Sequence, residues 1–197
     1  MKISEGVEIH HDGELPARSG LGSSSSFTVG LLKSLYALKQ QMKSPRQLAE
    51  ESIDVEQNWL NESVGIQDQI MAAHGGFQII EMGPDANWNT KNMIMPNEYL
   101  SSLEDHVLLG FSGISRMSEQ HAKNKVDNIK RGKINKELQT IYELTQEALQ
   151  AFQNQVGFDE IGRLLDKSWQ CKKLLAEGVT AAWMDDLYQT AIKNGAF

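Results

Sequence analysis

A glycine–serine turn that leads directly into an apolar helix limits the possible folds of this chain more than any other feature. The turn reads Gly20-Leu21-Gly22-Ser23-Ser24-Ser25-Ser26, and apolar residues follow it at helical spacing: Phe27, Leu31, Leu35 and Leu38. Such spacing predicts a helix that is buried over much of its circumference. The first turn of a helix presents unpaired backbone N–H groups, and glycines without a Cβ would let an anion approach them closely. The sequence therefore predicts a phosphate-binding loop at a helix start.

Two better-known phosphate-binding motifs are excluded for this turn. A Walker-type loop needs Gly-Lys-Ser/Thr at a fixed spacing, and a dinucleotide fingerprint needs a third glycine within a βαβ unit; the sequence has neither. Ser23 and Ser24 add hydroxyl groups that could reach a phosphate oxygen or a bound Mg²⁺. A plain loop before a serine-capped helix is the alternative interpretation of the same residues.

Two acidic residues lie where a carboxylate is unexpected. The capping sequence Ser44-Pro45-Arg46-Gln47 predicts a helix that continues to about residue 60, and Glu56 falls in line with its apolar residues Ala49, Ile53 and Leu60. A carboxylate on an apolar face is costly without a partner, so Glu56 is either a metal ligand or a rim residue that reaches solvent. Asp68 lies in the first turn of a short helix predicted over residues 67–74. It is either a base that faces the glycine turn or a favourable charge at a helix start.

Strands and helices alternate early in the chain and helices dominate late, which favours an α+β fold class. The expected strands are residues 7–10, 77–82, 92–95 and 107–111. From residue 115 onward the pattern is helical, with apolar seams at residues 134–152, 161–169 and 182–191.

Composition narrows the functional classes. The chain has 197 residues, 40% of them hydrophobic, and a formal net charge of −7, which argues against a general nucleic-acid binder. The sequence shows no signal peptide and no apolar run long enough to cross a bilayer, and Cys171 is its only cysteine. We therefore expect a cytoplasmic protein without a membrane or nucleic-acid partner. The histidines have no metal-ligand spacing, and the sequence leaves the oligomeric state open.

The order Pro16, three residues, then Gly20-Leu21-Gly22-Ser23-Ser24 resembles the second signature motif of the GHMP kinases, the family of galactokinase, homoserine, mevalonate and phosphomevalonate kinases. Longer stretches resemble the heptose 7-phosphate kinase group of that family. These stretches are residues 12–27, 65–69, 75–77, 110–116 and 164–169, so the similarity runs along nearly the whole chain.

The resemblance implies a fold and a set of site residues. The fold would be the two-layer α/β fold of GHMP kinases, with a partial N-terminal domain like ribosomal S5 domain 2 over residues 1–100 and a partial, mostly helical C-terminal domain over 101–197. ATP and Mg²⁺ would be the cofactors. The loop that binds ATP would be formed by Pro16, Gly20, Leu21, Gly22, Ser23, Ser24 and Ser25. Ser24 and Glu56 would serve the metal, and Asp68 would accept the proton of the substrate hydroxyl.

The implied reaction transfers the γ-phosphoryl group of ATP to the anomeric hydroxyl of D-glycero-D-manno-heptose 7-phosphate. Because that substrate already carries a phosphate, we expect a cation beside it, and Arg18 and Arg116 are the candidates. Another sugar kinase, of the galactose or fucose type, and an inactive nucleotide-binding fragment are the alternatives. Family members have a segment before residue 7 and a glycine-rich third motif beyond residue 197, so we expect this chain to correspond to the middle of a longer kinase.

Overall fold

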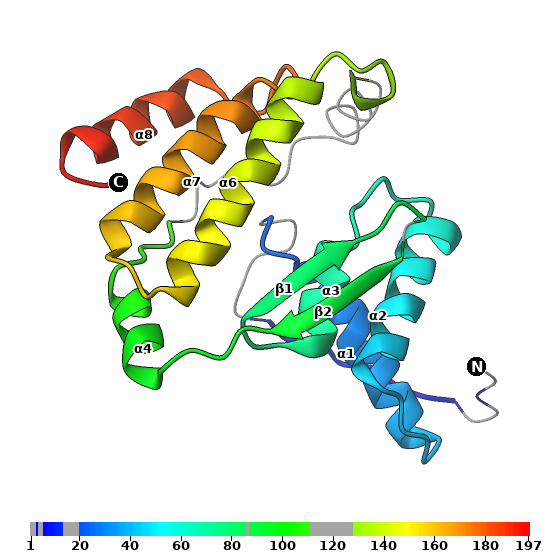
Figure 1. Cartoon of the computed structure of the whole chain (residues 1–197). Helices are drawn as coiled ribbons and strands as arrows, with labels where there is room; N and C mark the ends of the chain where they lie inside the picture. The colour runs from blue at the N-terminus through cyan, green and yellow to red at the C-terminus, as the bar shows by residue number, and fades with distance from the viewer. Residues whose placement is uncertain (1–2, 4–5, 14–19, 86, 111–127) are drawn as a thin grey trace.

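The computed structural model describes residues 3, 6–13, 20–85, 87–110 and 128–197. The predicted α+β class is confirmed, because the described elements are helices together with one antiparallel hairpin (Figure 1). In chain order the elements are α1 (Ser23–Leu38), α2 (Pro45–Asp54), the π-helical turn η1 (Val55–Trp59), α3 (Gln67–His74), β1 (Gln78–Met82), β2 (Trp88–Asn92), α4 (Asn97–Asp105), α6 (Asn135–Gln153), α7 (Phe158–Lys173) and α8 (Ala182–Lys193).

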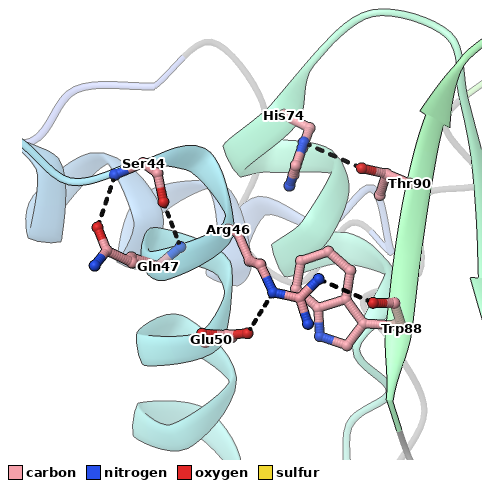
Figure 2. Close-up of polar contacts among 7 residues, drawn as sticks. All are labelled: Ser44, Arg46, Gln47, Glu50, His74, Trp88 and Thr90. Atoms are coloured by element: carbon pink, nitrogen blue, oxygen red, sulfur yellow. Dashed lines mark hydrogen bonds and ion pairs between the residues drawn. The ribbon is translucent and has the colours of Figure 1, made fainter.

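The start of α2 follows the prediction. The Ser44 hydroxyl accepts a hydrogen bond from the Gln47 backbone N–H (3.2 Å), and the Ser44 N–H donates to the Gln47 side-chain oxygen (3.0 Å), as Figure 2 shows. Pro45 occupies the first helical position, where its missing N–H costs nothing. The reciprocal pair satisfies two backbone donors and fixes where the helix begins.

Arg46 fastens α2 to the second strand of the hairpin. Its guanidinium lies over the Trp88 ring at 4.5 Å and donates to the Trp88 carbonyl at 3.1 Å, while its Nε donates to Glu50 at 2.8 Å (Figure 2). Trp88 in turn packs with Ala49 and Ile70, all three at most 7% exposed. This cluster is the core of the first half of the chain, and α1, α2 and α3 pack against one another around it (Figure 1).

A second core lies between α6 and α7, which run side by side in Figure 1. Its buried members are Leu144, Ala151, Ile161 and Leu164. The Phe77 ring, just before β1, meets the Phe152 ring of α6 edge-on at 5.1 Å, and the Tyr99 hydroxyl of α4 donates to the Val156 carbonyl at 3.0 Å. These contacts join the hairpin and α4 to the late helices.

Among the helices that the structure describes, none has the length and apolar character needed to span a membrane.

Three sequence expectations about strands need correction. Residues 7–10 belong to no strand, because no neighbouring strand in the described part of the chain pairs with them. The strand expected at 92–95 instead covers Trp88–Asn92, where Ile80 pairs with Thr90 across the hairpin. Residues 107–110 form no regular element, and residue 111 lies outside the described part. The helix Asn97–Asp105 was not predicted.

The expected seams of the late helices are correct only in part. Ile161 and Leu164 are buried as predicted, whereas Leu165 is 66% exposed and Leu187 in α8 is 61% exposed. The α6–α7 contact covers a narrow stripe of α7, so the residue after Leu164 already points away from it. Of the long helical region expected from residue 115, residues 115–127 lie outside the described part.

Candidate active site

The glycine turn ends at the first residue of α1. Gly20 and Gly22 both adopt left-handed backbone angles, with φ of 80° and 70°. Gly22 stands directly before the 16-residue helix and no side chain caps it, while its carbonyl accepts the first helical bond from the Ser26 N–H at 2.9 Å. The N–H groups of the first turn thus have no side-chain acceptor from a cap. A helix start of this kind favours an anion through both its N–H groups and its dipole.

Asp68 lies beside this turn. It occupies the first turn of α3 and is exposed, and α1 and α3 pack against each other. A methyl group placed on Gly22 would lie 3.3 Å from Asp68 Cβ and Cγ and 3.4 Å from its Oδ2. A side chain at position 22 would therefore require Asp68 to shift by a few tenths of an ångström. The structure therefore brings the turn and Asp68 together.

Glu56 is buried beside the first turn of the same helix, α1. It is 1% exposed, and its Oε2 accepts two hydrogen bonds, from Ser25 Oγ at 3.0 Å and from Gln69 Nε2 at 2.7 Å. Its other oxygen, Oε1, is buried and has no hydrogen-bond partner. A buried carboxylate oxygen without a donor is costly unless a cation satisfies it.

Glu56 is the second residue of the π-helical turn that follows α2. The Leu60 N–H bonds to the Val55 carbonyl five residues back at 2.9 Å, so α2 ends in a turn that is wider than an α-helical one. The sequence predicted one continuous face with Leu60 on it, but Leu60 is 59% exposed because the extra residue shifts the helical register. Turns of this type occur frequently at functional sites.

The serine that contacts Glu56 is Ser25. The sequence assigned Ser24 to the metal, but Ser24 is exposed, and the contact recorded for it is its carbonyl, which accepts a bond from Thr28 Oγ1 at 3.0 Å. Ser25 is 4% exposed and points to the carboxylate. Ser23 is half-buried and Leu21 is exposed. Sequence reasoning also gave no role to Gln69, whose only signal was its place beside Asp68.

Three expected site residues, Pro16, Arg18 and Arg116, lie outside the described residues. A hollow of about 880 Å³ lies between residues 7–13 and α1, and Leu21 and Ser23 of the turn contribute to its wall. Its other lining residues belong to residues 7–13 and to α1, with apolar side chains such as Phe27, Leu31 and Leu35 among them, and neither Glu56 nor Asp68 lines it. The polar site and the apolar hollow are thus separate features.

The residues present fit a magnesium ion in one specific way. In the described part of the chain, no group of three His, Cys, Asp or Glu side chains could hold a metal by itself. Mg²⁺ in phosphoryl-transfer sites is usually held by one or two carboxylates and by the substrate's phosphate oxygens. Glu56, with one oxygen held and the other free, supplies a single protein ligand of that kind.

The sequence was compared with known protein families, and one family matches the segment that contains this site. Residues 1–76 match the family of GHMP kinases N terminal domains. The first 76 residues are therefore similar to the N-terminal domain of GHMP kinases. The matched residues include the glycine turn, Glu56 and Asp68, so the three features described above all fall inside the matched segment.

Two named relatives extend the similarity beyond residue 76. The chain is 29% identical to the D-glycero-alpha-D-manno-heptose 7-phosphate kinase of Campylobacter jejuni over 199 residues, which is 96% of this chain and 56% of that protein. It is 23% identical to the bifunctional fucokinase/GDP-fucose pyrophosphorylase of Arabidopsis thaliana, over 94% of this chain and 18% of that protein. The chain thus spans little more than half the length of the first of these relatives.

A solved structure shares the fold. A Campylobacter jejuni protein assigned as a sugar kinase superposes with a TM-score of 0.62 at 25% identity, over 93% of this chain and 51% of that protein. The helix-rich α+β arrangement is therefore that of a sugar-kinase relative.

Proposed function

We propose that this chain is part of an ATP-dependent sugar kinase that phosphorylates the anomeric hydroxyl of D-glycero-D-manno-heptose 7-phosphate. The observation that carries the proposal is the close approach of Gly22 to Asp68, which sets a carboxylate directly beside an anion-binding helix start. Phosphoryl transfer needs this juxtaposition, because the acceptor hydroxyl must lose its proton next to the phosphate it attacks.

Each part of the site has a role in this proposal. The backbone N–H groups from Gly20 to Ser25 cradle the phosphates of ATP, and Pro16 belongs to the same sequence motif. Asp68 is exposed, so it can take the proton of a substrate hydroxyl. Glu56 and Ser24 serve a Mg²⁺ ion, which would neutralise charge on the transferring phosphoryl group. The free Oε1 of Glu56 supports this assignment.

We propose the acceptor sugar from the similarity to known kinases and from two positively charged residues. The heptose 7-phosphate kinase is matched over 96% of this chain, which supports a phosphorylated heptose as acceptor. We assign the phosphate of the acceptor to Arg18 and Arg116, whose guanidinium groups suit bidentate phosphate binding. The match to a fucokinase supports a second candidate, a fucose-type acceptor. We also place the protein in the cytoplasm, in keeping with its single cysteine.

The test is an ATP-consumption assay on the purified chain with heptose 7-phosphate, other sugar phosphates, fucose and galactose. In the same assay Asp68→Asn should lower turnover by about 100-fold or more while the Kd for Mg-ATP changes little, because a general base acts in the transition state. Asp85→Asn makes the same charge change at an exposed position in the hairpin turn and should leave both values unchanged.

The outcomes separate the alternatives. Turnover with fucose but not with heptose 7-phosphate would favour the second candidate. Mg-ATP binding by calorimetry without turnover would favour an inactive nucleotide-binding fragment, and absence of both would contradict the proposal. Near-normal turnover in Asp68→Asn would show that the base has been misassigned.

A further inference from the structure

The Gln69 side chain is buried in the wall of the site without touching solvent. It is 0% exposed, and its amide donates to Glu56 Oε2 at 2.7 Å. Its own oxygen, Oε1, has no partner. Since an ionised carboxylate can only accept hydrogen bonds, the amide must present its nitrogen to Glu56. The contact fixes the orientation of both side chains.

The hydrogen bonds to Glu56 are distributed unevenly. Ser25 and Gln69 both donate to Oε2, and Oε1 receives nothing from the protein. If the pair served stability alone, one donor on each oxygen would satisfy the buried carboxylate better, and an apolar residue in its place would avoid the desolvation cost altogether. Two donors on a single oxygen instead hold the carboxylate in one orientation and leave a defined oxygen available.

We propose that Gln69 is a positioning residue for Glu56: it holds Oε2 so that Oε1 remains free for the divalent cation that accompanies the nucleotide. This inference rests on the proposed function. Partners that orient a metal ligand in this way change metal affinity by about 10–100-fold when they are removed. Gln69 itself contacts neither nucleotide nor acceptor in this proposal.

The position of Gln69 in α3 gives the contact a second consequence. Asp68 and Gln69 are consecutive in the first turn of α3, and they reach different parts of the site: Asp68 lies against Gly22, and Gln69 holds Glu56. One rigid helical turn therefore sets the position of the base and the orientation of the metal ligand together. A shift of α3 would disturb both at once.

The test uses the full chain and Mn²⁺ as a paramagnetic probe, titrated in the presence of ATP and followed by electron paramagnetic resonance. Gln69→Met keeps the length of the side chain but removes the donor, and we expect it to weaken Mn²⁺ binding by about 10-fold or more. Gln78→Met is the control, because it removes an amide that donates to the Gly75 carbonyl at 2.9 Å, away from Glu56. Its Mn²⁺ affinity should match that of the unaltered chain.

A double variant separates positioning from stability. Glu56→Gln/Gln69→Glu exchanges the two partners and so restores an amide–carboxylate hydrogen bond between the helices. Its urea unfolding midpoint should recover relative to Gln69→Glu, which sets two carboxylates face to face. Its Mn²⁺ affinity should stay low, because the carboxylate would then belong to residue 69 of α3, and its free oxygen would no longer occupy the position of Glu56 Oε1.

Two results would overturn the inference. Equal Mn²⁺ affinity in Gln69→Met and the unaltered chain would remove the positioning role and leave the proposed function standing, and so would full recovery of Mn²⁺ binding in the exchanged variant. Absence of Mn²⁺ binding to the unaltered, folded chain in the presence of ATP would instead contradict the proposed function, and the positioning role would fall with it.

Discussion

Gly22 is required at its position for two independent reasons. Its φ of 70° lies in the left-handed region, which costs a residue with a side chain about 1–2 kcal/mol. Its Cα also faces the Asp68 side chain, so any Cβ would lie 3.3 Å from two of its carbon atoms. Gly20, two residues earlier, shares the first constraint with a φ of 80° but has nothing within 4 Å of a Cβ.

This difference makes a matched pair of variants. Gly20→Ala and Gly22→Ala should both lose stability through backbone strain, by about 1–2 kcal/mol each. Gly22→Ala should lose about 1 kcal/mol more, because the new methyl group overpacks against Asp68. Urea unfolding at neutral pH measures both values. An equal loss in the two variants would mean that the contact between the turn and Asp68 is looser in solution than in this structure.

Some residues of the candidate site could be predicted from the sequence and others could not. The turn, Glu56 and Asp68 were found because glycine, a lone carboxylate on an apolar helix and an acid at a helix start are visible in the sequence. The contact of Ser25 with Glu56 was not visible, because consecutive helical residues point about 100° apart and the rotation of α1 depends on its packing. The contact of Gln69 with Glu56 was also missed, because it depends on how α3 packs against the turn that carries Glu56.

At the level of elements, α8 is attached to α7 by a polar cluster. The Tyr188 hydroxyl of α8 donates to Asp166 of α7, and Gln170 donates to the same carboxylate oxygen at 2.9 Å. The bonds from Gln170 and Tyr188 lower the pKa of Asp166 below its usual value. Burial, together with Asp166, raises the pKa of Tyr188 above its usual value. Both shifts keep the hydrogen-bonded pair in its present protonation state over a wide pH range.

The two shifts set the pH window in which this pair stabilises the fold. The contribution of Asp166 is present above the ordinary aspartate pKa of about 4 and is lost as pH falls through its lower folded-state value. The contribution of Tyr188 is present below the ordinary tyrosine pKa of about 10 and is lost as pH rises through its higher folded-state value.

Tyr188→Phe should therefore lower the free energy of unfolding by about 0.5–1 kcal/mol near neutral pH, a modest value because the pair is partly exposed. The difference from the unaltered chain should shrink below about pH 4 and above about pH 10. Tyr142→Phe is the control, since its side chain is 60% exposed on α6. Denaturant unfolding across this pH range measures the effect, and a difference that does not vary with pH would rule out the charged hydrogen bond as its source.

Elements with strong local signals were predicted correctly, and those defined by distant contacts were not. The helix Gln67–His74 and the start of α2 follow from a capping box and flanking glycines, which act within a few residues. The strand Trp88–Asn92 has a mostly polar sequence, and it forms because Ile80 and its neighbours pair with it. Residues 7–10 show the converse, since their strand-like alternation has no partner in the described part of the chain.

At the scale of the whole molecule, a large part of the apolar surface stays uncovered. The side of α1 that faces residues 7–13 lines the hollow of about 880 Å³, and Ile9, Phe27 and Leu38 on its wall are 39–58% exposed. Apolar surface of this extent, beside residues 7–13 that pair with no strand in the described part of the chain, favours association between chains. We therefore expect the purified chain to self-associate in a concentration-dependent way.

Leu38→Lys tests the source of that association. It places a charge on the wall of the hollow at a residue that is 58% exposed, so the fold should change in stability by no more than about 0.5 kcal/mol. Sedimentation velocity should show less self-association than in the unaltered chain. Met42→Lys adds the same charge at a residue that is 98% exposed and does not line the hollow. If Met42→Lys suppressed association equally, net charge rather than the hollow would be the cause.

The wide turn at Val55–Trp59 also determines which changes of chain length the site can tolerate. It holds one residue more than an α-helical turn would, so loss of a single residue there would restore an ordinary helix and leave α2 intact. If the lost residue came after Glu56, α2 would still carry Glu56 in the same register, and Glu56 would still face Ser25. A relative that lacks one of residues 57–59 would therefore keep both the core and the buried acid.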